Sequence, residues 1–252
     1  MAQKVTIRAP LAGAFLFVWL LGQAWAASYT AQVQHVIDGD SLLLTNGQQL
    51  RLIGVNTPEM VGPDGAPQPL AHKARQLLAN LIGEGPIRIY PGQQKKDHYG
   101  RLLVYVETVD GRDVQQRLLS EGLGFLVAIP PNLDRLIRYK TAQDQARGAK
   151  RGIWALADYA PIEASSLDPA SHPGGFAQIR GTITAYNASR RYHYFRMGKN
   201  FELKIPKAAW TYFGGPPKQL LNRSVIARGW INQGKYRLQM QVAHPDMLEL
   251  KP

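Results

Sequence analysis

The sequence contains no cysteine. This absence excludes disulfide bonds and thiolate metal sites, and it removes the acylated cysteine that anchors a lipoprotein. An oxidising compartment is compatible with such a chain, because it has no thiol that can mispair. Heptad repeats and low-complexity tracts are also missing, so the sequence gives no sign of a coiled coil or a repeat assembly.

Long hydrophobic runs are scarce as well, and none comfortably reaches the roughly 20 residues that span a bilayer. Near the amino terminus, Lys4 and Arg8 precede the apolar segment 11–21, and Ala24-Trp25-Ala26 forms a small-x-small cleavage site. This pattern is typical of a secretory signal peptide, here residues 1–26. We therefore expect an exported protein, periplasmic or secreted, without stable membrane association after signal cleavage. An uncleaved anchor is the alternative.

Acidic residues are few relative to basic ones. Eighteen Asp and Glu stand against thirty Lys and Arg, which gives a net charge of +12, or 12 − 2 = +10 without the signal segment. This excess favours a polyanionic partner such as nucleic acid or an anionic membrane surface, although many basic proteins have neither. The 252 residues, 45% hydrophobic and 19% charged, are typical of a globular protein with two small domains.

The segment 37–59 contains the clearest structural signal of the chain. Two apolar runs, 42–44 and 50–55, flank the Asn46-Gly47 pair, which is one of the strongest short signals for a β-hairpin. A hairpin folds the chain back on itself. The acidic turn 38–40, before the first run, then lies near the polar residues that follow the second run.

The hairpin would gather the groups that metal-assisted hydrolysis of a phosphodiester needs. The acidic turn and the polar residues after the second run offer oxygen ligands that suit a hard cation. Glu59 can orient and deprotonate a water molecule, and Arg51 can stabilise charge that develops on a phosphate. The joint presence of these groups indicates a catalytic site.

This stretch resembles the staphylococcal nuclease (thermonuclease) family, whose signature runs from an acidic IDGD turn to an R-x-x-x-V-D-T-P-E strand end. Asp97-His98-Tyr99-Gly100-Arg101 resembles the D-x-Y-G-R motif of that family. The segment 146–154, ARGAKRGIW, resembles its closing A-x-x-x-x-x-G-[IL]-W motif. The resemblance covers residues 31–157, about half of the chain.

The resemblance implies a calcium-dependent nuclease that cleaves DNA or RNA and leaves 3′-phosphate ends. Separately, we expect the protein to be a monomer. The resemblance assigns catalysis to Arg51, Glu59 and Arg101, calcium binding to Asp40, Asn56 and Thr57, and substrate stacking to Tyr99. The family has aspartate at position 56, whereas Asn56 offers an oxygen without charge. Because ligand charge tunes calcium affinity, we expect weak binding. The family's second binding tyrosine has no clear counterpart in residues 122–131.

Each of these roles has a structural alternative. Asp40 can be a turn former, Arg51 and Arg101 can be surface charges, and Tyr99 can pack in the core. The rival to the enzyme is therefore a catalytically weak nuclease-like barrel that binds nucleic acid or protein. Retention of Arg51, Glu59 and Arg101 together favours the enzyme, since a binding module does not need that combination.

The patterns predict a mainly β fold with α-helices (α+β). Residues 28–158 would form a five-stranded barrel of the OB type packed by about three helices. Its predicted strands lie at 33–37, 42–44, 50–55, 87–90 and 102–106, and its helices at 70–81, 114–119 and 133–146. The proline-rich segment 63–69 would be a loop beside the site, either a plain connector or a gate.

Residues 159–175 are rich in Pro, Ser, Ala and Gly, which predicts a linker. Residues 176–252 resemble, more weakly, a carboxy-terminal OB-like module of some bacterial members of the family. The predicted strands are 179–186, 192–197, 201–205, 225–231 and 236–242, with a short helix at 206–213. This unit would be a second small β-barrel.

The second unit also carries a candidate accessory site for nucleic acid, formed by Arg191, Tyr192, Tyr194 and Arg196. In a strand, Tyr192, Tyr194 and Arg196 share one face, and bases stack on such aromatic side chains. The alternative is that a small barrel simply needs aromatic residues inside and arginines outside. The sequence favours neither interpretation.

Overall fold

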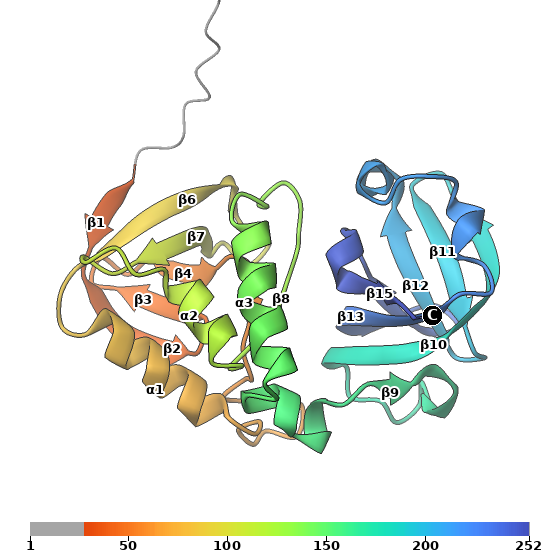
Figure 1. Cartoon of the computed structure of the whole chain (residues 1–252), viewed down its shortest axis with the longest axis horizontal. Helices are drawn as coiled ribbons and strands as arrows, with labels where there is room; N and C mark the ends of the chain where they lie inside the picture. Colours follow the sequence, from red (N-terminus) through yellow and green to blue (C-terminus); the bar gives the residue numbers. More distant parts are fainter. Residues whose placement is uncertain (1–27, 252) are drawn as a thin grey trace, which may run out of the picture.

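The computed structural model describes residues 28–251, and the predicted signal peptide lies outside this range. Two β-barrels lie next to each other, the first on the left of Figure 1 and the second on the right. Within the described range, no helix has the length and apolar character that crossing a membrane requires. The prediction of a mainly β fold with helices, made of two barrels, is confirmed.

The first barrel is closed by its amino-terminal segment. Its strands are β1 (Tyr29–Ala31), β2 (Val33–Asp38), β3 (Ser41–Leu44), β4 (Gln49–Leu52), β6 (Ile87–Lys96) and β7 (Leu102–Glu107). They are hydrogen-bonded in the order β1-β6-β7-β4-β3-β2. Because β1 and β2 are successive parts of one segment, their pairing with β6 and β3 closes a five-stranded barrel. The parallel pair β4 and β7 brings the third and fifth strands together.

The predicted hairpin joins β3 to β4. Ser41 pairs with Arg51 and Leu42 with Leu50. Gly47 takes a φ of 82° in the turn, a conformation that is easy only for glycine, and its N–H donates to Leu44 O at 2.9 Å. The prediction from the Asn46-Gly47 pair is confirmed. After β4, the second strand of this hairpin, the chain enters a separate two-stranded sheet that consists of β5 (Val55–Asn56) and β8 (Phe125–Leu126).

Three α-helices pack on this barrel: α1 (Ala71–Ile82), α2 (Val114–Ser120) and α3 (Leu136–Gly148). In α1, Ala74, Leu78 and Ile82 recur every four residues and are buried in the core. Gly83 ends this helix with a φ of 57° and donates its N–H to Ala79 O. The predicted helix was therefore placed to within one residue at each end.

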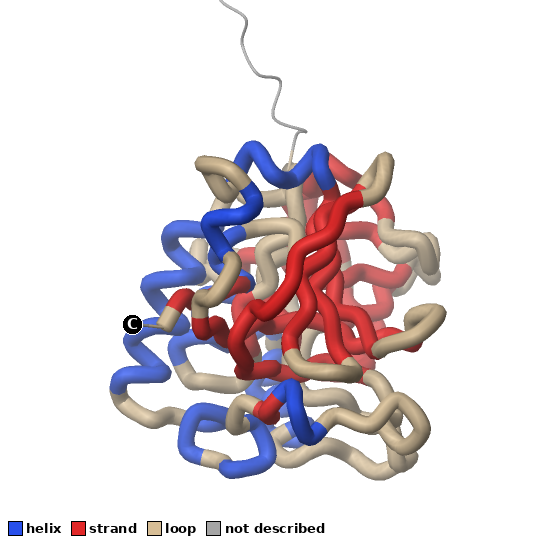
Figure 2. Tube along the Cα trace, turned by 90° about the vertical axis from the view of Figure 1, so that its right-hand side faces the viewer, coloured by secondary structure: helices blue, strands red, loops and turns tan. Residues whose placement is uncertain are grey.

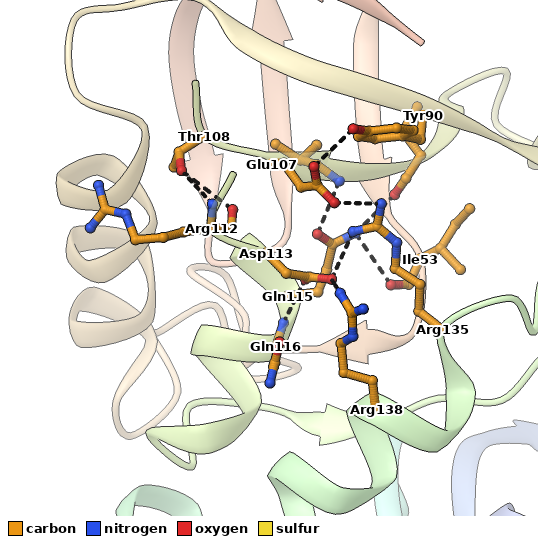
Figure 3. Close-up of polar contacts among 12 residues, drawn as sticks. Ile53, Tyr90, Glu107, Thr108, Arg112, Asp113, Gln115, Gln116, Arg135 and Arg138 are labelled. Carbon is orange, nitrogen blue, oxygen red and sulfur yellow. Dashed lines mark hydrogen bonds and ion pairs between the residues drawn. The ribbon is translucent and has the colours of Figure 1, made fainter. Parts of the chain in front are cut away.

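A buried ion network that the sequence did not predict fixes α2 and α3 against the barrel (Figure 3). Asp113 caps α2 by accepting from Gln116 N at 2.9 Å, and it pairs with Arg135 at 2.7 Å. The Tyr139 hydroxyl donates to Asp113 Oδ1 at 3.1 Å. Arg135 also pairs with Glu107 of β7 at 2.8 Å. One aspartate thus links a helix start, a second helix and, through Arg135, a strand.

The second barrel repeats the strand arrangement of the first. Its strands are β10 (Gly175–Ala188), β11 (Tyr192–Met197), β12 (Phe201–Pro206), β13 (Ser224–Gln233) and β14 (Leu238–Gln241). They pair in the order β10-β11-β12-β14-β13, and β13 returns to β10. Between the third and fourth strands lies a 3-10 helix, η4 (Lys207–Tyr212), where a short helix was predicted. After β14 follow η6 (Pro245–Met247) and the edge strand β15 (Leu248–Leu250).

The segment expected to be a linker contains short elements. They are η2 (Ala157–Tyr159), which ends in it, β9 (Ile162–Glu163) and η3 (Ala164–Ser166). β9 pairs in parallel with β10, and Ala164 and Leu167 are buried in the second core. Two apolar residues in a polar stretch give no periodicity, so the sequence pattern did not reveal this packing. The domain boundaries themselves stay a prediction.

The two barrels meet through aromatic and charged contacts. Phe125 of β8 packs against Trp154 and Phe176, with ring centres 5.2 and 5.3 Å apart. Arg147 of α3 pairs with Glu249 of β15 at 2.8 Å. Burial raises the pKa of Glu249, but the hydrogen bonds from Arg147 and Lys251 outweigh this effect and lower the pKa to about 2. The second barrel is therefore attached to α3 and not only to the chain that connects it.

Asp113→Ala should strongly destabilise the protein. It removes the α2 cap and the partner of Tyr139, and it leaves Arg135 with Glu107 alone. Breaking a buried ion pair on one side costs about 3–5 kcal/mol. Urea unfolding should show this loss, whereas the control Asp110→Ala, at an exposed pair with Arg112, should change little. Equal effects of the two substitutions would contradict the role of the network.

Glu249→Gln should destabilise the protein at neutral pH but not in strong acid. A carboxyl with a lowered folded-state pKa stabilises the fold above its ordinary pKa of 4.5, and the effect is lost as pH falls through about 2. Because Glu249 is partly exposed, the loss should be about 1 kcal/mol or less. Calorimetric Tm values across this pH range test it, with Glu163→Gln as the control. A deficit that persists in strong acid would contradict the assignment.

Candidate active site

The acidic turn between β2 and β3 is bound to the corner that follows β5. Asp40 is only 2% exposed, and its Oδ2 accepts a hydrogen bond from Thr57 N at 2.8 Å. Its own N–H donates to Asp38 Oδ1 at 3.0 Å. The hairpin thus brings the turn and the corner together, as the sequence indicated.

Arg51 of β4 bridges this turn and this corner. Its Nη1 forms an ion pair with Asp40, and its Nη2 donates to Asn56 Oδ1 at 2.8 Å. Burial lowers the pKa of Arg51 to about 10, against the opposing charge of Asp38. The guanidinium therefore remains charged at neutral pH. Because a guanidinium has five N–H groups, Asp40 and Asn56 leave further donors for a ligand.

Glu59 lies at the start of the proline-rich loop, and this loop is fixed at both ends. Glu59 N donates to Gln68 Oε1 at 2.8 Å, and Gln68 N donates to Glu59 O at 3.0 Å. The hydroxyl of Tyr159, in the connection between the barrels, donates to Pro69 O at 2.5 Å. These contacts hold the Glu59 backbone in place.

The charges around Glu59 lie within electrostatic reach of one another. Burial raises the pKa of Glu59, and the charge of Asp38 raises it further. The guanidinium groups of Arg51 and Arg101 act in the opposite direction on the same pKa. The charges of the three predicted catalytic side chains therefore act on one another.

Arg101 is held by Asp97 within the turn that joins β6 to β7. The Arg101 Nε donates to Asp97 Oδ2 at 2.7 Å, and the N–H groups of Tyr99 and Arg101 both donate to Asp97 Oδ1 at 3.0 Å. Gly100 has a φ of 86°, which this tight turn requires. Asp97 accepts a side-chain hydrogen bond only from the Nε of Arg101. Neither Nη atom of Arg101 has a partner among residues 28–251. Both Nη atoms can bind a phosphate.

Tyr99 is exposed at the same turn, with 74% of its surface accessible. Its ring centre lies 3.8 Å from that of His98 and 5.4 Å from the guanidinium carbon of Arg101. Packing of Tyr99 in the core, the alternative considered from the sequence, does not occur. The exposed ring lies beside the charged cluster.

Two aspartates of the cluster received no role from the sequence. Burial raises the pKa of Asp38, against the attraction of Arg51, and its charge acts on Glu59. Asp97 positions Arg101 through the bonds described above. Both occur in the motifs that drew attention to their neighbours, Asp38 in the D-G-D turn and Asp97 in D-x-Y-G-R. That proximity in sequence was the available signal.

The oxygen groups near Asp40 form a donor set for a hard cation. Asp40 supplies a carboxylate, and Asn56 and Thr57 supply carbonyl oxygens. The hydroxyl of Thr57 is also buried there and has no hydrogen-bond partner among the described residues. No group of three or more His, Cys, Asp or Glu suited to a metal occurs in the described part of the chain. These donors fit calcium in kind, with a low charge count.

The four residues of the candidate accessory site do not join this cluster. Arg191 lies in the turn between β10 and β11, and Tyr192, Tyr194 and Arg196 lie on β11. They belong to the second barrel, on the other side of the molecule in Figure 1. Any role they have is therefore separate from the Glu59 cluster.

Comparison with known proteins finds a family and several relatives that match part of the chain. A model of the family described as Staphylococcal nuclease homologue matches residues 49–156. The thermonuclease of Staphylococcus hyicus is 35% identical over 138 residues, which are 53% of this chain and 80% of that protein. The thermonuclease of Staphylococcus intermedius is 34% identical over 125 residues, 48% of this chain and 74% of that protein. Endonuclease YncB of Bacillus subtilis (strain 168) is 32% identical over 132 residues, 50% of this chain and 62% of that protein.

These matches coincide with the barrel that carries the charged cluster. The family model covers the chain from β4 to the end of α3 and beyond, and it includes Arg51, Glu59 and Arg101. The similarity to the Staphylococcus hyicus protein extends over most of that relative's length. It follows that the chain belongs to the Staphylococcal nuclease homologue family.

Proposed function

We propose that this chain is a metal-dependent nuclease that hydrolyses phosphodiester bonds of DNA or RNA. The observation that carries the proposal is the cluster in which Arg51, Arg101 and Glu59 lie within electrostatic reach of one another. The names of the relatives, thermonuclease and endonuclease, support it. The net charge of +12 also suits a polyanionic substrate.

The two arginines would bind the scissile phosphate. Phosphoryl transfer depends mainly on positioning and on stabilising charge at the phosphate oxygens, and guanidinium groups contact such oxygens in pairs. Arg101 presents its Nη atoms because Asp97 holds Nε. Arg51 contributes N–H groups that Asp40 and Asn56 do not use.

Glu59 would accept the proton of the attacking water. The oxygen of that water attacks phosphorus in line with the leaving 5′-oxygen, which takes up a proton, and a 3′-phosphate end remains. A raised pKa makes the Glu59 carboxylate a stronger base. The hydrogen bonds between Glu59 and Gln68 keep the base in position.

Calcium is the proposed metal, and Asp40, Asn56 and Thr57 are the proposed ligands. A divalent cation bound there would polarise a phosphoryl oxygen as a Lewis acid. Arg51 contacts Asp40 and Asn56, so its charge competes with the cation for the same oxygens. This competition and the neutral side chain of Asn56 both favour weak calcium binding.

The alternative is a nuclease-like barrel that binds nucleic acid or protein without efficient cleavage. The observation that favours it is the contact of Arg51 with the two side chains proposed as calcium ligands. We further propose that the mature protein is an exported monomer, periplasmic or secreted, with residues 1–26 as its signal peptide. Fractionation of producing cells tests the location.

Digestion of plasmid DNA and of RNA by the mature protein tests the nuclease proposal directly. We expect cleavage with calcium and none with chelator, and we expect Glu59→Gln to lower the rate by about 10² to 10⁴ through loss of the base. The control Glu121→Gln removes an exposed carboxylate paired with Arg117 and should leave the rate unchanged. Binding of both polymers without cleavage in any metal would favour the alternative.

Asn56→Asp should strengthen calcium binding, because it adds a charge to the donor set. For the wild type we expect a Kd of about 10⁻⁴ to 10⁻³ M, and for the variant a value at least about tenfold lower. Calorimetric titration of metal-free protein measures both values, with the exposed Asn187→Asp as the control. Micromolar binding by the wild type, or no gain in the variant, would contradict the assigned ligands.

A further inference from the structure

The outer surface of β11 and β12 is polar and aromatic, whereas their inner surface forms the core of the second barrel. Phe195, Met197 and Leu203 are fully buried. Tyr194, which alternates with them, is partly exposed on the other face, and Arg196 is exposed. This alternation follows from the pleat of a strand, in which successive side chains point to opposite faces.

Five residues on the outer side of these strands and of the turn that precedes β11 form what we call the tyrosine face: Arg191, Tyr192, Tyr194, Arg196 and Lys204. The rings of Tyr192 and Tyr194 are 6.1 Å apart between centres. The ammonium of Lys204 lies 4.2 Å from the ring centre of Tyr192, and the guanidinium of Arg191 lies 6.0 Å from it. Aromatic rings and cations are thus interleaved on one surface.

The cations of the tyrosine face have no acidic partner. Within residues 28–251, Arg191, Arg196 and Lys204 form no ion pair, whereas arginines of the first barrel such as Arg112 and Arg135 do. The one acidic residue on the outer side of β12 is Glu202, which lies opposite Arg196 in the strand register but accepts its hydrogen bond from Gln239, at 2.6 Å. One carboxylate against three cations leaves the face with a net positive charge.

Further cations and an aromatic residue lie at the end of the tyrosine face opposite Arg191. The turn between β13 and β14 contains Lys235, Tyr236 and Arg237, and Tyr236 is 74% exposed. Arg237 Nε donates to Lys199 O at 2.9 Å, which places this turn beside the one between β11 and β12. Positive charge thus occurs at both ends of the face as well as on it.

The position of β11 leaves this surface open. In Figure 1, β11 lies on the side of the second barrel away from β3 and β4 of the first barrel. Figure 2 shows that side toward the viewer, with strands along its middle. A ligand on this side would not compete with the Glu59 cluster for space.

We propose that the tyrosine face binds single-stranded nucleic acid. The partly exposed rings suit unpaired bases, which stack on aromatic side chains, and the cations suit the backbone phosphates. The second and third strands of a five-stranded barrel of this type are a surface that binds oligonucleotides, and β11 and β12 hold those places in the second barrel. Sites on barrels of this type span about 4–16 nucleotides.

The tyrosine face would hold a strand without cutting it. The turn before β11 has Ser189, Arg190 and Arg191 where the first barrel has the acidic residues Asp38 and Asp40. Glu202 is the only carboxylate on the outer side of β12. The two barrels therefore share an architecture but not the groups for hydrolysis. The proposal takes its ligand class from the proposed nuclease function, and it predicts tighter binding of long strands than of short ones.

Fluorescence anisotropy with a labelled single-stranded oligothymidine of about 20 nucleotides tests the proposal. The full mature chain is used in chelator and with the Glu59→Gln background, so that cleavage has no effect on the result. We expect Tyr194→Phe to bind as the wild type does, because the ring remains, and Tyr194→Leu to bind at least about fivefold more weakly. We expect Arg196→Ala to reduce the slope of log K against log salt by about 0.7, the value for one phosphate contact to a single strand.

Arg112→Ala is the matched control for Arg196→Ala, since it also removes one exposed positive charge but lies on the first barrel. A loss confined to Tyr194→Leu and Arg196→Ala supports the proposal, with Tm values showing that the variants are folded. If Tyr194→Leu binds like Tyr194→Phe and Arg196→Ala like Arg112→Ala, the proposal is wrong and a protein partner would be the better explanation for the face. Because no cleavage is measured, failure of the nuclease proposal does not affect this result.

Discussion

The contact of Arg51 with both Asp40 and Asn56 is the interaction on which the first barrel's site depends. A buried guanidinium is stable only if it is paired, and these two partners come from the turn before β3 and the end of β5. The same Asp40 accepts from Thr57 N, so the turn, the strand and the corner are fixed together. Glu59 follows that corner directly, so the corner determines where Glu59 lies. The geometry of the proposed chemistry thus follows from one ion pair at the end of a hairpin.

The parts of the fold and of the site that the sequence predicted are those marked by short, local sequence patterns. The Asn46-Gly47 pair gave the hairpin, apolar spacing gave α1 with its Gly83 end, and three motifs gave the catalytic and metal-binding candidates. The network around Asp113 was missed because its partners, Arg135 and Tyr139, are more than twenty residues away in sequence. The packing of Ala164 and Leu167 was missed for a related reason, since they begin and directly follow a single three-residue 3-10 turn, which is too short to show a period. Interactions through space between distant residues leave little trace in local patterns.

The two barrels show one strand order used with different surface residues. In each barrel the third and fifth strands pair in parallel, β4 with β7 and β12 with β14. The first barrel places acidic residues in the turn between its first two strands, which suits the cation site proposed there. The second places arginines there and tyrosines on the next strand, which suits binding alone. The fold therefore fixes where a ligand can lie, and a few side chains decide what happens to it.

The central claim is that Arg51 and Arg101 hold the same phosphate beside Glu59. The most direct measurement is a crystal structure of the Glu59→Gln variant with calcium and an oligonucleotide that the variant does not cut. We predict that one backbone phosphate contacts the guanidinium groups of both Arg51 and Arg101. A structure in which the bound phosphate contacts only one of the two arginines, or neither, would contradict the account.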